Sequence, residues 1–339
     1  MSEYQYYEFL ALDRPLTAKQ RAELRSISSR AEITATRFTN EYQWGDLKGD
    51  PLQMVKEYFD AFLYLANWGT RQVMFRLPRG VLDPEIARPY CYTDTASLIE
   101  TDGHLILSLN VDQEEADDYW DEPGGQLAVM VQARSELAAG DLRLLYLAWL
   151  LALQSDFVDD EETEPSVPPG LKNLSAGLQA VVDFFEIDEN LIAGAAASSP
   201  AIEEPGGLAE WIAAAVPGRT AAELREAAED RRAAREKAAE QRRRKAEARK
   251  AAAEAAAYAK RLDQLATRAE EAWREAAELI ETKKPREYDR AVSLLRDLQA
   301  LAEREGGSAE FRQRFGELRA RHDRKPSLQE RFDKAGLPS

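Results

Sequence analysis

The feature that most constrains this chain is a run of 33 residues, 225–257, that contains no Val, Ile, Leu, Met, Phe or Trp. Such a segment cannot build a hydrophobic core, so the parts of the chain on either side of it must fold around cores of their own. The run consists mainly of Ala, Glu, Arg and Lys, which are strong helix formers. It therefore predicts a solvated helix, about 50 Å long, between a globular head and a small helical tail.

The charges of the chain are distributed unevenly. Residues 1–206 carry 15 Lys and Arg against 36 Asp and Glu, a balance of −21, whereas residues 207–339 carry 30 against 25, a balance of +5. Together they give the net charge of −16. We therefore expect the head to repel nucleic acids and anionic membranes, and the remainder of the chain to be able to attract them.

Cysteine usage and hydropathy indicate the cellular setting. Cys91 is the only cysteine, so the chain has no intrachain disulfide and no cysteine-rich zinc site. The first residues, MSEYQYYEF, lack the basic and apolar regions of a signal peptide. The longest apolar run, Leu144–Leu153, is shorter than the ~20 residues that span a bilayer, so it predicts a buried core helix. We expect a soluble cytoplasmic protein without a membrane partner.

The head alternates strand-like and helix-like segments. Apolar, aromatic and β-branched residues predict strands at 4–12, 31–44, 72–77 and 104–109. Thr17 and Gln20 form a capping box before a helix, and Asp50 begins another helix whose apolar spacing continues to Ala66. Further helices are predicted at 126–138, 142–154, 174–185 and 189–197. This order predicts an α+β head, with helices on one face of a mainly antiparallel sheet, and a ferredoxin-like fold is one form of it.

Two similar loops follow predicted elements of the head, because Trp44 and Trp68 are each followed by a glycine. One interpretation is architectural: the glycine supplies a tight turn and the tryptophan packs over the end of the element. The other is functional: both loops leave one edge of the sheet and place Trp44, Asp46, Trp68 and Arg71 around one pocket that binds a ligand or a peptide. These four are the candidate binding residues.

Four strings in the head resemble an uncharacterised family of bacterial proteins: YQYYEFLALDRPL at 4–16, WGDLKGDP at 44–51, YFDAFLYLANWGTR at 58–71 and LRLLYLAWLL at 142–151. The resemblance covers most of the head. It implies a bacterial, cytosolic setting and supplies no activity, cofactor or site residues.

Acidic residues gather in two segments, seven of them within residues 112–122 and six within 156–164. A calcium loop would need ligands at alternating positions and a turn glycine, and neither segment has that pattern. Solvated surface loops are the favoured interpretation, and contact with the basic helix, within the chain or from another copy, is the alternative. No metal site or cofactor is predicted.

The composition of the central helix is typical of both coiled coils and disordered regions. The register of its alanines shows whether it has a coiled-coil seam. Alanine pairs begin at residues 221, 227, 233 and 238, at intervals of six, six and five. A coiled-coil seam needs alternating steps of three and four. The helix is therefore predicted to be single and monomeric rather than a coiled-coil dimer. Its predicted supports are the charge pairs Glu229–Arg232, Arg232–Glu236, Glu240–Arg244 and Arg243–Glu247.

The centre of this helix, residues 229–250, holds ten basic and five acidic residues. Its densest basic run consists of Arg242, Arg243, Arg244 and Lys245. The favoured interpretation is a charged spacer. The alternative is a helix that contacts nucleic-acid phosphates through these four residues, in a manner that is sensitive to salt.

Apolar residues return from Leu262 onward and predict a helical tail. Lys284-Pro285 ends the first helix, and Gly306-Gly307 turns the chain between two more helices that form a hairpin. The predicted domains are a head at 1–198, a Pro/Gly-rich linker at 199–218, the charged helix at 219–260 and the tail at 261–335.

No catalytic residue is predicted, because His104 and His322 are the only histidines and no phosphate-binding or nucleophile motif occurs. The first hypothesis is a non-enzymatic adaptor, with a head that binds an unidentified protein or ligand and a tail that docks elsewhere. The second is a nucleic-acid accessory factor. The third is a carboxylate-dependent enzyme that uses Asp46, Asp50 or Asp60.

Overall fold

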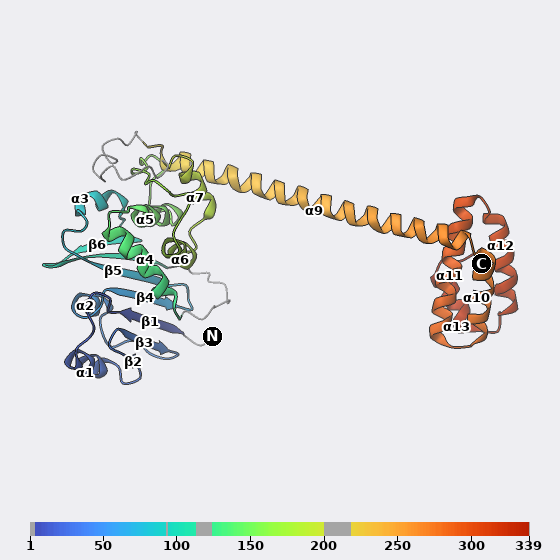
Figure 1. Ribbon diagram of the computed structural model, residues 1–339, viewed down its shortest axis with the longest axis horizontal. Helices are drawn as coiled ribbons and strands as arrows, with labels where there is room; N and C mark the ends of the chain where they lie inside the picture. The colour runs from blue at the N-terminus through green and yellow to red at the C-terminus, as the bar shows by residue number, and fades with distance from the viewer. Residues whose placement is uncertain (1–3, 93, 113–123, 200–217, 339) are drawn as a thin grey trace. The chain divides into compact units, whose positions relative to one another are not determined.

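The computed structural model describes residues 4–92, 94–112, 124–199 and 218–338. Most of the first acidic segment and most of the predicted linker lie outside these residues. The chain divides into two compact units, Met1–Glu236 and Lys237–Ser339 (Figure 1). The α+β class is confirmed, whereas the boundaries of the four predicted domains and the ferredoxin-like refinement stay predictions.

The described part of the first unit is built on a seven-stranded antiparallel sheet in the order β2-β3-β1-β4-β5-β7-β6. The strands are β1 Gln5–Leu10, β2 Glu32–Ile33, β3 Arg37–Tyr42, β4 Ala61–Ala66, β5 Arg71–Pro78, β6 Ala96–Glu100 and β7 His104–Val111. Its helices are α1 Ala18–Ile27, α2 Pro51–Glu57, α3 Pro84–Ala87, α4 Gln126–Ala138, α5 Arg143–Gln154, α6 Ala176–Phe185 and α7 Glu189–Ala196, with a 3-10 turn at Arg88–Tyr90.

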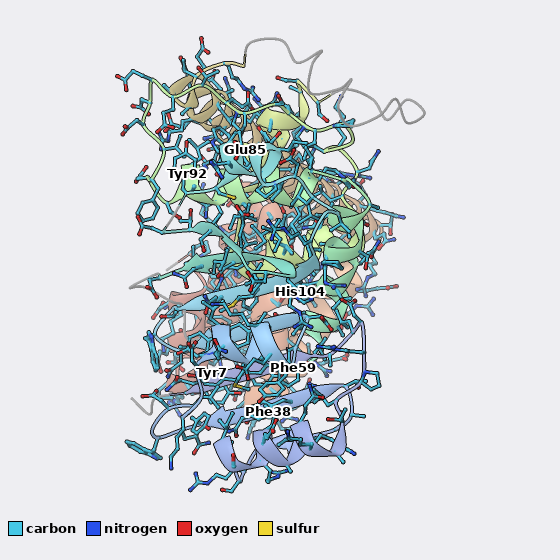
Figure 2. All side chains as sticks on the ribbon, turned by 90° about the vertical axis from the view of Figure 1, so that its left-hand side faces the viewer. Tyr7, Phe38, Phe59, Glu85, Tyr92 and His104 are labelled. Atoms are coloured by element: carbon cyan, nitrogen blue, oxygen red, sulfur yellow. The ribbon has the colours of Figure 1, made fainter. Side chains whose placement is uncertain are left out.

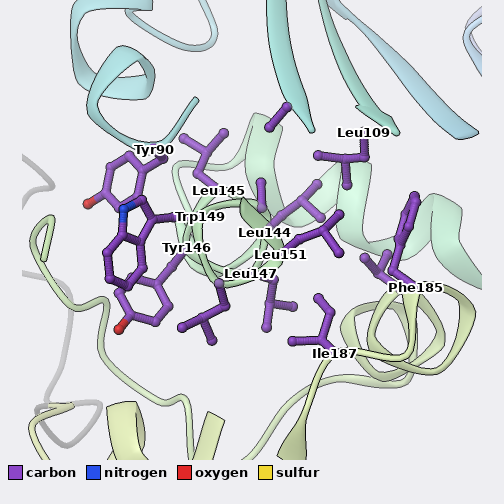
Figure 3. Packing of buried hydrophobic residues seen from close by; sticks show 14 of the residues in the cluster. Tyr90, Leu109, Leu144, Leu145, Tyr146, Leu147, Trp149, Leu151, Phe185 and Ile187 are labelled. Carbon is purple, nitrogen blue, oxygen red and sulfur yellow. The ribbon is translucent and has the colours of Figure 1, made fainter. Parts of the chain in front are cut away.

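Helices cover both faces of this sheet, rather than the one face that was predicted. On one face Phe9, Phe38 and Phe62 pack against Leu24 of α1 and Val55 of α2. On the other face lies a larger core that contains the side chains of α4, α5 and α6. Every residue from Leu144 to Leu153 of α5 is buried, and Figure 3 shows side chains leaving this helix in all directions among apolar neighbours. The apolar run is thus the predicted core helix.

The prediction of one helix from Asp50 to Ala66 is wrong. Asp50 caps α2, because its carboxylate accepts a hydrogen bond from the Leu52 amide at 2.9 Å, but α2 ends at Glu57. Residues 61–66 form β4, which pairs with β1 and β5 near the centre of the sheet and is buried at almost every position. A short apolar run fits a buried strand as well as a helix, so spacing alone could not distinguish them.

The segment 31–44 is also divided, into the strands β2 and β3. The two strands pair with each other in antiparallel fashion, with Ile33 opposite Phe38. The Thr34 hydroxyl accepts hydrogen bonds from the amides of Thr36 and Arg37, which closes the turn between the strands. The predicted single strand is therefore a small hairpin.

The long helix α9, Ala221–Ala266, begins at the predicted capping box of Thr220 and Glu223. Its first turns are buried in the head, where Ala221 and Leu224 are fully inaccessible to solvent. Residues 229–261 are all exposed. The helix is therefore a solvated element over most of its length, and it is docked at its start.

The second acidic segment, 156–164, is a surface loop in which Asp156, Asp159, Asp160 and Glu161 are exposed, as was favoured, and it also docks the start of α9. The carbonyls of Asp160 and Glu162 accept hydrogen bonds from the first two amides of the helix, at 3.1 and 2.9 Å. Arg225 pairs with Asp160 and with Asp156 and donates to the Val158 carbonyl. Negative groups stabilise a helix N-terminus, which explains the density of carboxylates here. The other interpretation of the acidic segments, contact with the basic helix within the chain, therefore also applies to this segment.

The Lys237–Ser339 unit is a helical bundle around its own core (Figure 1). After α9 it contains α10 Ala269–Glu281, α11 Pro285–Glu305, α12 Ser308–Arg321 and α13 Pro326–Lys334. The breaks at Lys284-Pro285 and Gly306-Gly307 lie where they were predicted. A further break at Thr267-Arg268 turns the chain between α9 and α10. It contains no proline or glycine, so it could not be predicted from the sequence.

Candidate functional site

The register of the sheet brings the two Trp-Gly loops to the same edge. Gln5 of β1 lies opposite Tyr42 of β3 on one side and opposite Ala66 of β4 on the other. Trp44 and Trp68 each follow two residues later, so the two loops leave strands that are roughly 10 Å apart. Both side chains are accessible, 75% for Trp44 and 44% for Trp68. These are large aromatic surfaces that the head core does not bury.

Asp46 is held beside this edge by a buried polar group. The Gln5 amide donates to the Asp46 carboxylate at 2.7 Å and to the Gly45 carbonyl at 3.2 Å. The other end of the Gln5 amide accepts hydrogen bonds from the hydroxyls of Tyr7 at 2.7 Å and Tyr64 at 3.0 Å. Burial raises the pKa of Tyr7 to about 12, so its phenol stays protonated and acts as a donor. Figure 2 labels Tyr7 among the aromatic residues of this layer.

Arg71 lies on the opposite face of the sheet from Asp46. It is the cross-strand partner of Leu65, whose side chain belongs to the core beneath α4–α6, whereas Tyr7 belongs to the core on the other face. Arg71 donates to the Phe184 carbonyl at 2.8 Å and pairs with Glu186 at 2.6 Å, which ties the sheet to the end of α6. The structure therefore brings the two loops to one edge but separates Asp46 and Arg71, which do not line one pocket.

The three candidate carboxylates of the enzyme hypothesis are occupied by structural contacts. Asp46 binds Gln5, Asp50 caps α2, and Asp60 is fully buried against Arg76 at 2.5 Å. Asp60 also accepts hydrogen bonds from the Leu12 and Asp13 amides. Burial opposes ionisation of Asp60, but these amides and the Arg76 guanidinium outweigh it and lower the pKa of its carboxyl.

The histidines occupy two different environments. His104, at the start of β7, lines a cavity of about 470 Å³ with Arg79, Glu85 and Glu100. Burial and the nearby Arg76 lower the pKa of His104, so it is neutral at pH 7. His322 is buried in the C-terminal unit, 3.7 Å from Glu281. The sequence did not predict this cavity, because its residues come from two turns that are distant in the chain.

The four residues of the basic run at the centre of α9 fall into two groups, those that pair with a glutamate of the same helix and those that do not. Arg244 pairs with Glu240 at 2.6 Å and Arg243 approaches Glu247 at 3.9 Å, as the charge spacing predicted. Arg242 and Lys245 have no acidic partner among the described residues. The predicted pairs of Arg232 are not formed; Arg232 instead pairs with Asp188 of the head. Of the four candidate phosphate-contacting residues, two are therefore paired with glutamates and two are available to bind an anion.

Across the described ranges no group of three or more His, Cys, Asp or Glu side chains is arranged to hold a metal ion. Within the same ranges no helix has both the length and the apolar character that crossing a bilayer requires. A cytoplasmic location stays a prediction.

Comparison with known proteins adds no relative: no family model, no curated protein and no solved structure matches the chain.

Proposed function

We propose that this chain is a non-enzymatic adaptor, in which the head and the helical tail bind different partners and α9 connects them. The observation that carries the proposal is that the head and the C-terminal unit each have hydrophobic cores of their own, while residues 229–261 of the helix that connects them in the chain are all exposed. A helix that packs on neither core over this length adds nothing to the stability of either unit. A connecting role accounts for the length and the exposed, charged surface of this helix.

The candidate binding surface of the head is the sheet edge that carries Trp44 and Trp68. Tryptophan is enriched at the centres of protein interfaces, because a large rigid ring buries much area at a small entropic cost. Two accessible tryptophans on neighbouring loops supply such anchors. The Asp46–Gln5 contact holds the first loop in place. A protein or peptide is the partner that this surface suits.

The candidate binding surface of the tail is a cavity of about 480 Å³ beside α11. Tyr258, 43% exposed, contributes its ring from α9, and Arg296 and Glu303 contribute charges from α11. Asp297, which also lines the cavity, pairs with Arg261. Aromatic and charged groups together favour a polar peptide segment as the tail partner.

The adaptor proposal is tested by affinity capture from a bacterial lysate with the full chain. The head variant is W44A/W68A, the tail variant is Y258A/R296A, and the control V81A/V129A removes two exposed apolar residues elsewhere on the head. We expect the head and tail variants to lose different sets of captured proteins, and the control to lose neither. If both variants lose the same proteins, or no more than the control loses, the adaptor proposal is contradicted.

Of the other two hypotheses, only the nucleic-acid factor has a specific observation in its favour, the two available cations on α9. The carboxylate enzyme has none, because Asp46, Asp50 and Asp60 each hold a structural contact.

A further inference from the structure

In the part of α9 between Lys237 and Arg261, every acidic residue is paired with a basic residue of the same helix. The acidic residues of this part are Glu240, Glu247 and Glu254, each seven residues after the last. Each is paired within the helix, in the couples Arg244–Glu240 at 2.6 Å, Arg243–Glu247 at 3.9 Å and Lys250–Glu254 at 4.0 Å. These residues therefore form one compensated side of the helix.

A second set of cations is not compensated. Arg242, Lys245, Arg249 and Lys260 are all exposed, and the described residues provide no acidic partner for them. At roughly 100° per residue, the four fall within an arc of about 60°, on the side of the helix opposite the three glutamates. We call these four residues the basic face. It belongs entirely to the Lys237–Ser339 unit, and it extends over about 27 Å of helix.

The other positions on this side of the helix indicate which partner fits. Ala246, Ala253 and Ala256 lie between the cations, so a partner backbone can approach closely. Protein interfaces are centred on large apolar or aromatic anchors, and residues 225–257 contain none on any side. Interfaces with nucleic acids are instead polar and strongly positive. Single strands are bound by stacking on aromatic rings, which this face also lacks, so a duplex suits it better.

We propose that the basic face of α9 binds the phosphate backbone of a duplex nucleic acid, without reading its sequence. The cations form charge-assisted hydrogen bonds to phosphate oxygens and release condensed counterions from the duplex. This inference is independent of the head and tail partners of the adaptor. The head carries a balance of −21, so association is weak at high salt and depends on the local field of the helix.

The test compares two triple variants of the full chain that remove equal charge. R242A/K245A/R249A removes three cations of the basic face, and R243A/R244A/K250A removes three from the compensated side. Alanine keeps the helix propensity high in both, and circular dichroism verifies that their helix content is unchanged. Binding to a fluorescent 30-base-pair duplex of arbitrary sequence is measured by anisotropy between 25 and 150 mM salt.

With four phosphate contacts, the wild-type chain should show a slope of log K against log salt of about −3.6. R242A/K245A/R249A should leave a slope of about −1 and weaken binding about tenfold or more at 50 mM salt. R243A/R244A/K250A should keep the wild-type slope, because its cations are committed to glutamates. Duplexes of unrelated sequence should bind equally.

Three results would overturn the proposal. The first is the absence of duplex binding by the wild-type chain at 25 mM salt. The second is an equal loss of binding in both triple variants, which would mean that total charge matters and the face does not. The third is displacement of the duplex by poly-aspartate at equal charge concentration, which would assign the face to an acidic polypeptide.

Discussion

At the residue scale, two buried carboxylates, Glu8 in β1 and Asp60 just before β4, respond to burial in opposite ways. Asp60 is surrounded by donors, since Arg76 and the amides of Leu12 and Asp13 all reach it, and its pKa is lowered. Glu8 is 1% exposed and meets a single guanidinium, that of Arg37 at 2.9 Å. Burial raises the pKa of Glu8, although Arg37 and Tyr6 oppose the shift. The number of donors around each carboxylate decides the direction.

Asp60→Asn should cost about 3–5 kcal/mol of unfolding free energy at pH 7, because it leaves the Arg76 charge buried without a counter-charge. Urea unfolding measures this loss. Asp50→Asn is the control: asparagine also caps helices, so this variant should lose only a few tenths of a kcal/mol.

The loss at Asp60 should depend on pH in a defined direction. The folded pKa lies below the ordinary value of 3.8, so the stabilising contribution is present above that pH and disappears as pH falls through the folded value. The difference between wild type and Asp60→Asn should therefore shrink below about pH 4. A difference that stays constant down to pH 2 would contradict this account.

Glu8→Gln should show the opposite dependence. The folded pKa of Glu8 lies above its ordinary 4.5, so stability that is present below that pH is lost as pH rises through the folded value. Glutamine does not titrate. The stability of Glu8→Gln relative to wild type should therefore increase between pH 4 and pH 7, as measured by urea unfolding. A relative stability that falls over this range would show that Arg37 outweighs burial.

At the element scale, the largest apolar side chain that the start of α9 buries in the head is that of Leu224. Leu224 is fully buried and would lie 3.1 Å from a side chain built at Gly194 of α7. Leu224→Ala should cost about 2–5 kcal/mol of local stability, because it opens a cavity at this contact. Hydrogen exchange should then lose protection at residues 221–228, while residues 240–250, which pack on neither core, serve as the internal reference. Unchanged protection at 221–228 would mean that the acidic segment alone holds the helix.

Elements with a local signal could be predicted from the sequence. The capping boxes at Thr17 and Thr220 and the Asp50 cap each begin a helix where they were expected, because a cap is decided by a few adjacent residues. The segment 58–66 could not be assigned in the same way. Its apolar residues fit a helix, and only pairing with β1, which is distant in sequence, and with the following strand β5 makes it a strand. The edge strand β6 lacked a clear pattern and was not predicted.

The candidate sites follow the same division. That Trp44 and Trp68 share an edge depends on the register of β3 and β4 with β1. The pattern of elements did not contain this register, because the segment before Trp68 was predicted to be a helix. That Asp46 and Arg71 face opposite sides depends on which residues of each strand are paired, which composition does not contain. The basic face of α9 could have been found from the sequence, because the spacing of Glu240 from Glu247 places them on one side.

At the scale of the whole molecule, the separate cores predict separate unfolding. Phe315 is fully buried in the core of the C-terminal unit, and Phe75 is fully buried in the head. Phe315→Ala should cost the C-terminal unit about 3–5 kcal/mol of unfolding free energy and lower the temperature of only one calorimetric transition. Phe75→Ala should lower the temperature of only the other. A single transition that shifts equally in both variants would show that the two units unfold as one.

The short strand β2 at one end of the sheet has a consequence for association. Only Glu32 and Ile33 pair with β3, and the residues flanking this edge include the charged side chains of Arg37 and Glu41. A strand from another molecule could form backbone hydrogen bonds with only two residues of β2, and its approach would desolvate nearby charges. Polymerisation by sheet extension is therefore blocked at this end by geometry, so crowded solutions of the protein should not seed fibres there.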